Sequence, residues 1–234
     1  MCRFKSGIIL KDRVFIPDYD SHTDMLEELK IADTEDNAKR LFVRAELVPP
    51  DDDVFTPVSS WKYHVDQDIL PDWYVTEVDE MRMREAVTEW AKEHIHIGEK
   101  IERIDSGTHW IKDCKVGNIC GSAEVRRIYG SAKVGNICGS AEVRCIYGSA
   151  EVGYIYDSAK VRCIYGSAKV GYIYGSAKVG YIYGSATIEI FKYSIWKHIK
   201  SVGIKDKAIL IDRYNNKIYH SGAFETVIVG GKKK

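Results

Sequence analysis

Long hydrophobic runs are missing from this 234-residue chain. No apolar stretch approaches the roughly 20 residues that a membrane-spanning helix needs, so we expect no membrane partner. Near the N-terminus the apolar run spans only three residues, 8–10, before charge returns, which is not the pattern of a secretory signal. We therefore expect a cytoplasmic protein whose six cysteines are reduced thiols.

Several motifs that carry chemistry are also missing. The chain has no phosphate-binding glycine loop, no Cys-x-x-Cys pair and no Gly-x-Ser-x-Gly. Two groups mix histidine with aspartate: Asp18, Asp20, His22 and Asp24, and His64, Asp66 and Asp68. The first straddles an expected helix start, where acidic residues are favoured electrostatically, and the second fits a solvated acidic edge. We accordingly predict no metal site and no cofactor.

Net charge is zero, but its distribution is uneven. Residues 1–106 hold 14 Lys and Arg against 25 Asp and Glu, and residues 107–234 hold 20 against 9. The halves therefore carry opposite net charge. This split indicates two modules with different partners, or two surfaces that attract each other and form a homo-oligomer.

A nine-residue repeat dominates the second half. Residues 116–187 are eight copies of V-x-x-I-x-G-S-A-x, and only Asp157 departs from the consensus, at the Gly position. A fixed short period predicts stacked units that bury their apolar residues against one another. With this single Asp in the array, a calcium-binding nonapeptide roll is excluded.

Within each unit, Val, Ile and Ala are the expected inward residues. Ala and the next Val are two apart and share a strand face. Gly-Ser is the predicted corner, because Gly tolerates positive φ, as Asp does at the exception. The spacing of three between Val and Ile predicts a second bend at the intervening pair. Two β-branched residues and a glycine in every nine exclude a helix.

A longer period of 18 residues is superimposed on the nine-residue repeat. The pair after Val alternates between Gly-x and Arg-x through the first seven units. The sequence therefore predicts a parallel β-solenoid (β-helix) of about 18 residues per coil, with about four coils in the array. Equivalent residues would form columns on its surface. These columns include Arg126, Arg144 and Arg162; Tyr129, Tyr147, Tyr165 and Tyr183; Cys120 with Cys138; and Cys145 with Cys163.

The first 106 residues predict a small acidic α+β domain in the order ββαββα. Ser21 is the expected cap of the first helix, and 78–95 is the strongest helical segment, with Met83, Val87 and Trp90 on its apolar stripe. Cys2 is a candidate nucleophile, because removal of Met1 would place its thiol beside a free α-amine. A small N-terminal-nucleophile hydrolase or transferase, with the solenoid as scaffold, is therefore one alternative.

The array is flanked by segments that fit terminal caps. Residues 110–115 fit a degraded unit with Trp110 in the Ile position and Cys114 in the Ala position. Residues 208–220 predict a β-hairpin that turns near Asn215 and Asn216. We divide the chain into an α+β domain at 1–106, a β-solenoid at 107–196, and a hairpin cap with a basic tail at 197–234.

The nonapeptide array, its hairpin cap and the opening Met-Cys-Arg-Phe-Lys-Ser resemble uncharacterised β-helical repeat proteins of gut bacteria and their phages. The resemblance implies a phage or mobile-element origin, and hence the host cytoplasm, together with a β-helical domain. It brings no known activity.

These observations favour a non-enzymatic binding or interaction module. Its expected partner is an anionic ligand, a nucleotide or nucleic acid, or else a protein. The three arginines would supply charge and the four tyrosines flat faces for stacking. The N-terminal-nucleophile enzyme and a structural, self-associating repeat protein are the alternatives.

Overall fold

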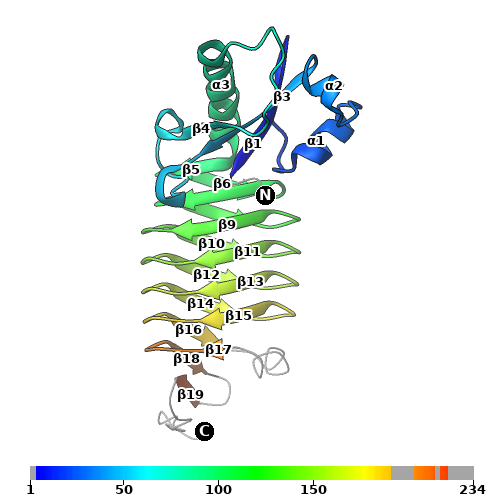
Figure 1. Cartoon of the computed structure of the whole chain (residues 1–234). Coiled ribbons are helices and arrows are strands. Elements are labelled where there is room, and N and C mark those ends of the chain that lie inside the picture. The colour runs from blue at the N-terminus through cyan, green and yellow to red at the C-terminus, as the bar shows by residue number, and fades with distance from the viewer. Residues whose placement is uncertain (1–3, 191–202, 214–216, 221–234) are drawn as a thin grey trace, which may run out of the picture. The chain divides into compact units, whose positions relative to one another are not determined.

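The computed structural model describes residues 4–190, 203–213 and 217–220 (Figure 1). It divides into two compact units, residues 1–95 and 96–234. An α+β unit is followed by a parallel β-solenoid that ends in an antiparallel strand pair, as the sequence predicts.

A four-stranded antiparallel sheet forms the centre of the N-terminal unit. Its strand order is β2-β1-β3-β4, with β1 at Lys5–Leu10, β2 at Val14–Phe15, β3 at Phe42–Val48 and β4 at Lys62–Val65. The central strands β1 and β3 are almost entirely buried, because helices cover both of their faces.

Helix α1 (His22–Glu28) covers one face, where Met25 and Leu26 pack with Ile8 and Phe42. The Ser21 hydroxyl accepts a hydrogen bond from the Asp24 amide, which confirms the expected cap.

Helix α3 (Thr76–His94) lies against the opposite face of the sheet. Its side chain Met83 approaches β1 at Gly7, where a Cβ atom would lie 3.0 Å from the Met83 methyl group. Three short helical segments complete the unit: α2 at Glu35–Ala38, and the 3-10 turns η1 at Pro50–Asp52 and η2 at Val58–Ser60.

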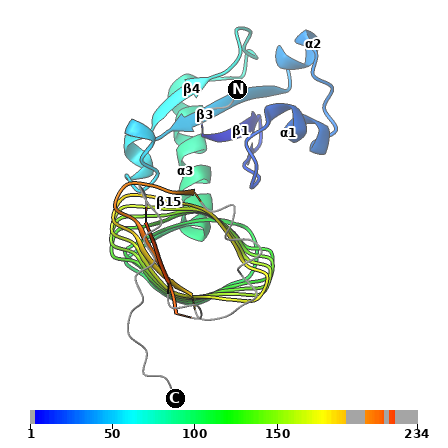
Figure 2. The same cartoon turned by 90° about the horizontal axis from the view of Figure 1, so that it is seen from below.

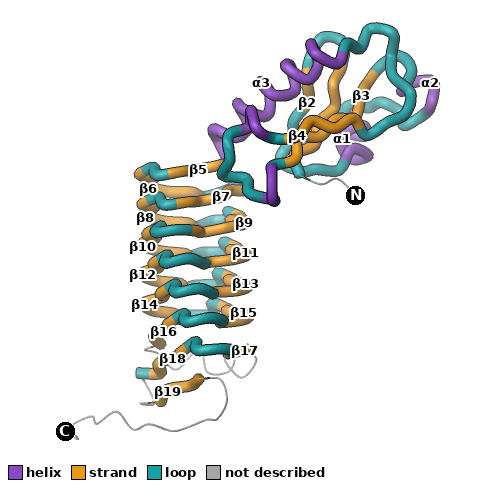
Figure 3. The backbone as a smooth tube through the Cα atoms, turned by 60° about the vertical axis from the view of Figure 1, so that its left-hand side comes forward, coloured by secondary structure: helices purple, strands orange, loops and turns teal. Residues whose placement is uncertain are grey.

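The repeats form two facing parallel sheets (Figures 1 and 3). One sheet holds β8 (Lys115–Ile119), β10 (Lys133–Ile137), β12 (Glu151–Ile155) and β14 (Lys169–Ile173). The other holds β9 (Glu124–Tyr129), β11 (Glu142–Ile146), β13 (Lys160–Ile164) and β15 (Lys178–Ile182). Paired residues in adjacent strands are 18 apart, for example Val134 with Val152, so two units make one coil. Seen end-on, the coils lie over one another (Figure 2).

Val, Ile and Ala of the repeat fill the interior, as predicted. In the coil of β10 and β11, Val134, Ile137 and Ala141 are at most 3% exposed. No turn forms at the two residues between Val and Ile, where a second bend is expected. Each strand continues through these two residues to the Ile. Alternation breaks inside the strand, which lets both apolar side chains point inward.

The Gly-Ser step is the corner. Its glycines adopt positive φ, from +59° at Gly121 to +75° at Gly148, and Asp157 takes the same conformation with φ 57°. At these corners a Cβ would also meet the previous coil, at 3.0 Å from the Gly130 backbone in the case of Gly148. Asp157 compensates for its strain, since its carboxylate accepts a hydrogen bond from the Gly139 amide at 3.2 Å.

The sheets extend beyond the recognisable repeats at both ends. They begin with β5 (Ile95–Ile97), β6 (Lys100–Ile104) and β7 (Thr108–Lys112). They continue through β16 (Thr187–Ile190), β17 (Gly203–Ile204) and β18 (Ile209–Asp212). Strand β19 (Lys217–His220) pairs antiparallel with β18, which confirms the hairpin, although its turn lies outside the described residues.

The assignment of Trp110 to the Ile position is wrong. A register shift between His109 and Trp110 pairs Trp110 with Arg127 and brings Ile111 opposite Ile128. Ile111 is therefore the fully buried residue, while Trp110 is half-buried. Cys114 does occupy the Ala position and is 1% exposed.

Candidate binding surface of the solenoid

Arg126, Arg144 and Arg162 form a column on the outer face of one solenoid sheet. They lie on β9, β11 and β13, whose neighbouring residues Val125, Val143 and Val161 pair in register. All three side chains are exposed. Adjacent strands in a sheet are about 4.8 Å apart, so the column repeats positive charge at that spacing.

Few carboxylates neutralise this arginine column. Arg126 pairs with Glu124 on its own strand at 3.4 Å. On the next strand Glu142 pairs with Lys160 at 2.6 Å, so this carboxylate is already engaged. Within the described residues, Arg144 and Arg162 form no side-chain ion pair. Like charges opposite one another are destabilising unless solvent or an anion meets them.

Three of the four predicted tyrosines form a stack beside these strands. The ring centroids of Tyr129 and Tyr147 are 4.5 Å apart, and those of Tyr147 and Tyr165 are 4.8 Å apart. Tyr183, one coil further on, packs on Tyr181 at 5.7 Å. Because the stacked rings cover each other's faces, an incoming base has no room between them. Between the stacked rings, ring edges and hydroxyl groups are therefore the parts open to a ligand.

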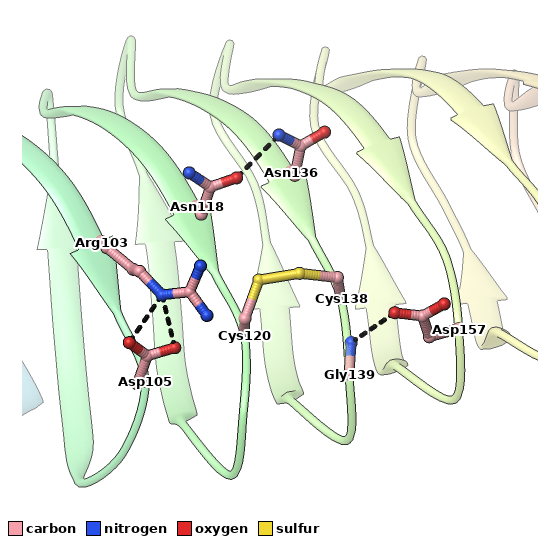
Figure 4. Close-up of a disulfide and its surroundings, with 8 residues drawn as sticks. All are labelled: Arg103, Asp105, Asn118, Cys120, Asn136, Cys138, Gly139 and Asp157. Atoms are coloured by element: carbon pink, nitrogen blue, oxygen red, sulfur yellow. Dashed lines mark hydrogen bonds and ion pairs between the residues drawn. A yellow bond between two sulfur atoms is a disulfide. The ribbon is translucent and has the colours of Figure 1, made fainter.

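The coil period generates further columns that the sequence analysis did not select. Tyr154 stacks on Tyr172 with centroids 4.9 Å apart, and Tyr156 on Tyr174 at 5.0 Å. Asn136 donates a side-chain hydrogen bond to Asn118 at 2.8 Å (Figure 4). The same 18-residue spacing that identified the first tyrosines predicts these columns as well.

A groove runs along the outer face of the other solenoid sheet. Its floor is a column of glycines, Gly117, Gly135, Gly153 and Gly171. A Cβ at Gly135 would lie 2.5 Å from the Gly117 carbonyl oxygen, so only glycine permits this close stacking. The groove is edged by an in-register column of charges: Lys100, Lys115, Lys133, Glu151 and Lys169. The 18-residue period predicts the part of this column at Lys133, Glu151 and Lys169, which end alternate units, whereas Lys100 and Lys115 precede the array.

The cysteines pair along the same period. Cys120 and Cys138 form a disulfide, with Cα atoms 4.6 Å apart (Figure 4). The expectation that all cysteines are reduced thiols is therefore wrong for this pair, because the coil stacking places the two side chains within bonding distance.

Cys145 and Cys163 lie in the same arrangement with thiols 2.6 Å apart. This hydrogen bond from Cys163 lowers the pKa of Cys145 to about 7, although burial opposes it, and the guanidinium groups of Arg144 and Arg162 lower it further. The same bond and burial raise the pKa of Cys163. The arrangement makes Cys145 the more acidic thiol of the pair.

Cys2 lies outside the described residues, so its role as a nucleophile stays a prediction. No helix in the described part of the chain combines the length and the apolar character needed to cross a membrane. No protein-family model matches the chain, and no curated protein or solved structure matches it either.

Proposed function

We propose that the solenoid is a non-enzymatic binding module for an extended anionic ligand that follows its axis. One observation supports this proposal above the others: both sheets hold cationic side chains in register from coil to coil. A polymer with regularly spaced negative groups complements such columns.

Rigidity favours this mode of binding. The cationic side chains project from strands whose backbone amides bond to the preceding coil, for example Lys133 to Cys114 at 2.8 Å. A preorganised surface loses little conformational entropy on binding, and repeated weak contacts add up along an extended ligand.

The arginines and the tyrosines would play different roles in binding, and the tyrosines would not stack on the ligand as the sequence analysis expects. The arginines would contact anionic groups such as phosphates, which the planar guanidinium binds through two donors. The tyrosines Tyr129, Tyr147 and Tyr165 would donate hydroxyl hydrogen bonds from their edges rather than stack with bases. The groove on the opposite sheet offers further lysines, although Glu151 interrupts their column and pairs with Lys133 at 3.3 Å.

A cytoplasmic location belongs to this proposal. The Cys120–Cys138 disulfide weighs against it, because disulfides are rare in reducing compartments.

The test uses two probes, a fluorescently labelled 20-nucleotide single-stranded DNA and inorganic polyphosphate. Binding of the DNA is followed by anisotropy across a salt series, with unlabelled polyphosphate as competitor. We compare the wild type with Arg126→Gln/Arg144→Gln/Arg162→Gln and with Lys115→Gln/Lys133→Gln/Lys169→Gln, each of which removes three charges.

For single strands, log K falls with log salt at a slope of about 0.7 per phosphate contact. Loss of the arginine column is therefore expected to reduce that slope by about 2 and to weaken binding at low salt. If the arginine variant bound the DNA as tightly as the wild type and the lysine variant bound it more weakly, the binding site would be the groove and not the arginine column. No binding of either probe at low salt would end the proposal.

A further inference from the structure

The N-terminal unit buries a carboxylate on its central sheet. Glu46 lies on the central strand β3 and is 3% exposed. In the part of the chain that the structure describes, no hydrogen bond or ion pair reaches its side chain. Burial of an unpaired charge is costly, and buried carboxylates are normally paired or bound to a metal.

A second buried group beside Glu46 is also unsatisfied. Ser6 is the direct cross-strand partner of Glu46 on β1, so their side chains share one face of the sheet. The Ser6 hydroxyl is buried, and no described residue bonds to it. This face is the one that α1 covers, because Ile8, two residues on, packs with Met25.

Helix α1 brings a histidine to the same place. His22 is the first residue of α1 and is 5% exposed. Its Nε2 lies 3.3 Å from the carbonyl oxygen of Ala45, which is an acceptor only, so Nε2 carries the proton and donates it. Nδ1 faces the carboxylate of Asp66, and in the tautomer with the proton on Nε2 its lone pair is directed to a cation held between the two groups. Metal-binding histidines are commonly oriented in this way, by one ring nitrogen donating to a backbone carbonyl.

Asp66, the residue after β4, completes the group. Its carboxylate oxygen lies 3.3 Å from Nδ1 of His22. Ligand atoms of His22, Glu46 and Asp66 all lie within 4.8 Å of one another. Two ligand atoms about 2.1 Å from a tetrahedral metal ion are separated by about 3.4 Å, close to the distance between His22 and Asp66.

Two of the three residues border a hollow that is open to solvent, and Glu46 lies buried behind them. His22 and Asp66 line an open hollow together with Asp20, Asp33 and Arg44. The guanidinium of Arg44 is engaged by Asp33, so its charge is already compensated. Asp20 is likewise engaged by Lys5, at 3.0 Å. Asp66 is therefore the one acidic group of this lining without a lysine or arginine partner among the described residues, and its carboxylate favours a cation beside His22.

We propose that His22, Glu46 and Asp66 bind a divalent transition-metal ion of the Zn²⁺ type. One imidazole nitrogen and two carboxylate oxygens suit such an ion better than Mg²⁺ or Ca²⁺, which prefer oxygen alone. Three protein ligands leave coordination positions for water or a substrate. This proposal departs from the prediction of no metal site. It joins one residue from each of the two histidine-aspartate groups in the sequence with Glu46, which belongs to neither.

The test is a titration of tag-free full-length protein with Zn²⁺, measured by calorimetry and by thermal unfolding. We expect one ion per chain and a rise in Tm for the wild type. Glu46→Gln keeps the shape of the side chain and removes its charge, so affinity is expected to fall at least tenfold. Asp68→Asn, an acidic neighbour outside the group, is the matched control and should bind as the wild type does.

A second readout separates metal binding from a folding defect. In EDTA, Glu46→Gln should unfold at the same Tm as the wild type or higher, because it removes an unpaired buried charge. In Zn²⁺ the wild type should have the higher Tm, since only the wild type is stabilised by bound metal. Zn²⁺ binding that survives unchanged in Glu46→Gln would come from other residues and would overturn the proposal, as would the absence of any Tm shift in the wild type.

Discussion

The two units of this chain bury different kinds of residue. Eight polar or charged residues are buried in the described chain, and six belong to the N-terminal unit: Lys5, Ser6, His22, Glu46, Asp79 and His94. The solenoid contributes only His96 and Asp212. Its interior is mainly a stack of Val, Ile and Ala, joined by Cys114 and Leu210 near the ends, and polar groups lie on its surface in columns.

This difference corresponds to the two different proposals for the two units. A repeated interior gives every coil the same environment, so the solenoid gains a regular surface suited to an extended ligand. An irregular interior places unlike groups together once, as at His22, Glu46 and Asp66. The proposal of a single metal site therefore concerns the N-terminal unit.

The largest expected effect is on the free energy of unfolding, and it tests whether equivalent core positions in different coils have the same environment. Ile128 and Ile164 lie two coils apart in one sheet and are both fully buried. Ile128→Ala and Ile164→Ala should each lower the free energy of unfolding by about 2–5 kcal/mol. The two losses should be equal within about 0.5 kcal/mol, because both side chains occupy the same position of the repeat and both pair with Ile146. Urea unfolding of the two variants measures the losses.

The N-terminal unit provides the matched contrast. Ile8 and Ile9 are equally buried neighbours on β1, but they face opposite layers of the unit. Ile8→Ala and Ile9→Ala should therefore have unequal costs. Unequal losses at Ile128 and Ile164, together with equal losses at Ile8 and Ile9, would contradict the comparison.

A smaller effect concerns the tyrosine stack at high pH. Burial raises the pKa of Tyr165 to about 12, above the value of 10 expected when unfolded. The neutral form is favoured in the fold, so this stabilisation is complete below pH 10 and is lost as pH rises through 12. The side chain is 36% exposed, so the loss is about 1 kcal/mol or less.

Tyr165→Phe keeps the ring in the stack and removes the ionisable hydroxyl. Between pH 10 and pH 12 this variant should lose less stability than the wild type in urea unfolding followed by circular dichroism. Identical pH profiles for the two proteins would show that the stack does not hold Tyr165 in its neutral form.

The smallest expected effect changes reactivity and leaves stability unaltered. With its pKa lowered to about 7, Cys145 is largely a thiolate at pH 7.5 and should react with iodoacetamide several-fold faster than Cys163 or the buried Cys114. Peptide mapping after timed alkylation measures the three rates. The double variant Arg144→Gln/Arg162→Gln should slow the alkylation of Cys145 selectively. Equal alkylation rates for Cys145 and Cys163 in the wild type would refute the assignment of Cys145 as the more acidic thiol.

The solenoid was largely predictable from the sequence because its period is itself structural information. Gly148 at a positive φ, Ile146 inside and Arg144 outside all follow from the unit and its alternation. The prediction failed where the repeat decays. Trp110 was placed inside because a register shift of one residue leaves no mark in a degenerate unit.

The sequence by itself therefore determined the coil length, the corners and the columns of the second unit, since identical segments can bury their apolar residues only by stacking in register. Tertiary structure alone decided which residues meet in the first unit. His22, Glu46 and Asp66 come from a helix start, a central strand and a strand end, and no local pattern relates them. Their proximity depends on how α1 packs on the sheet, which is set by the fit of many unlike side chains at once.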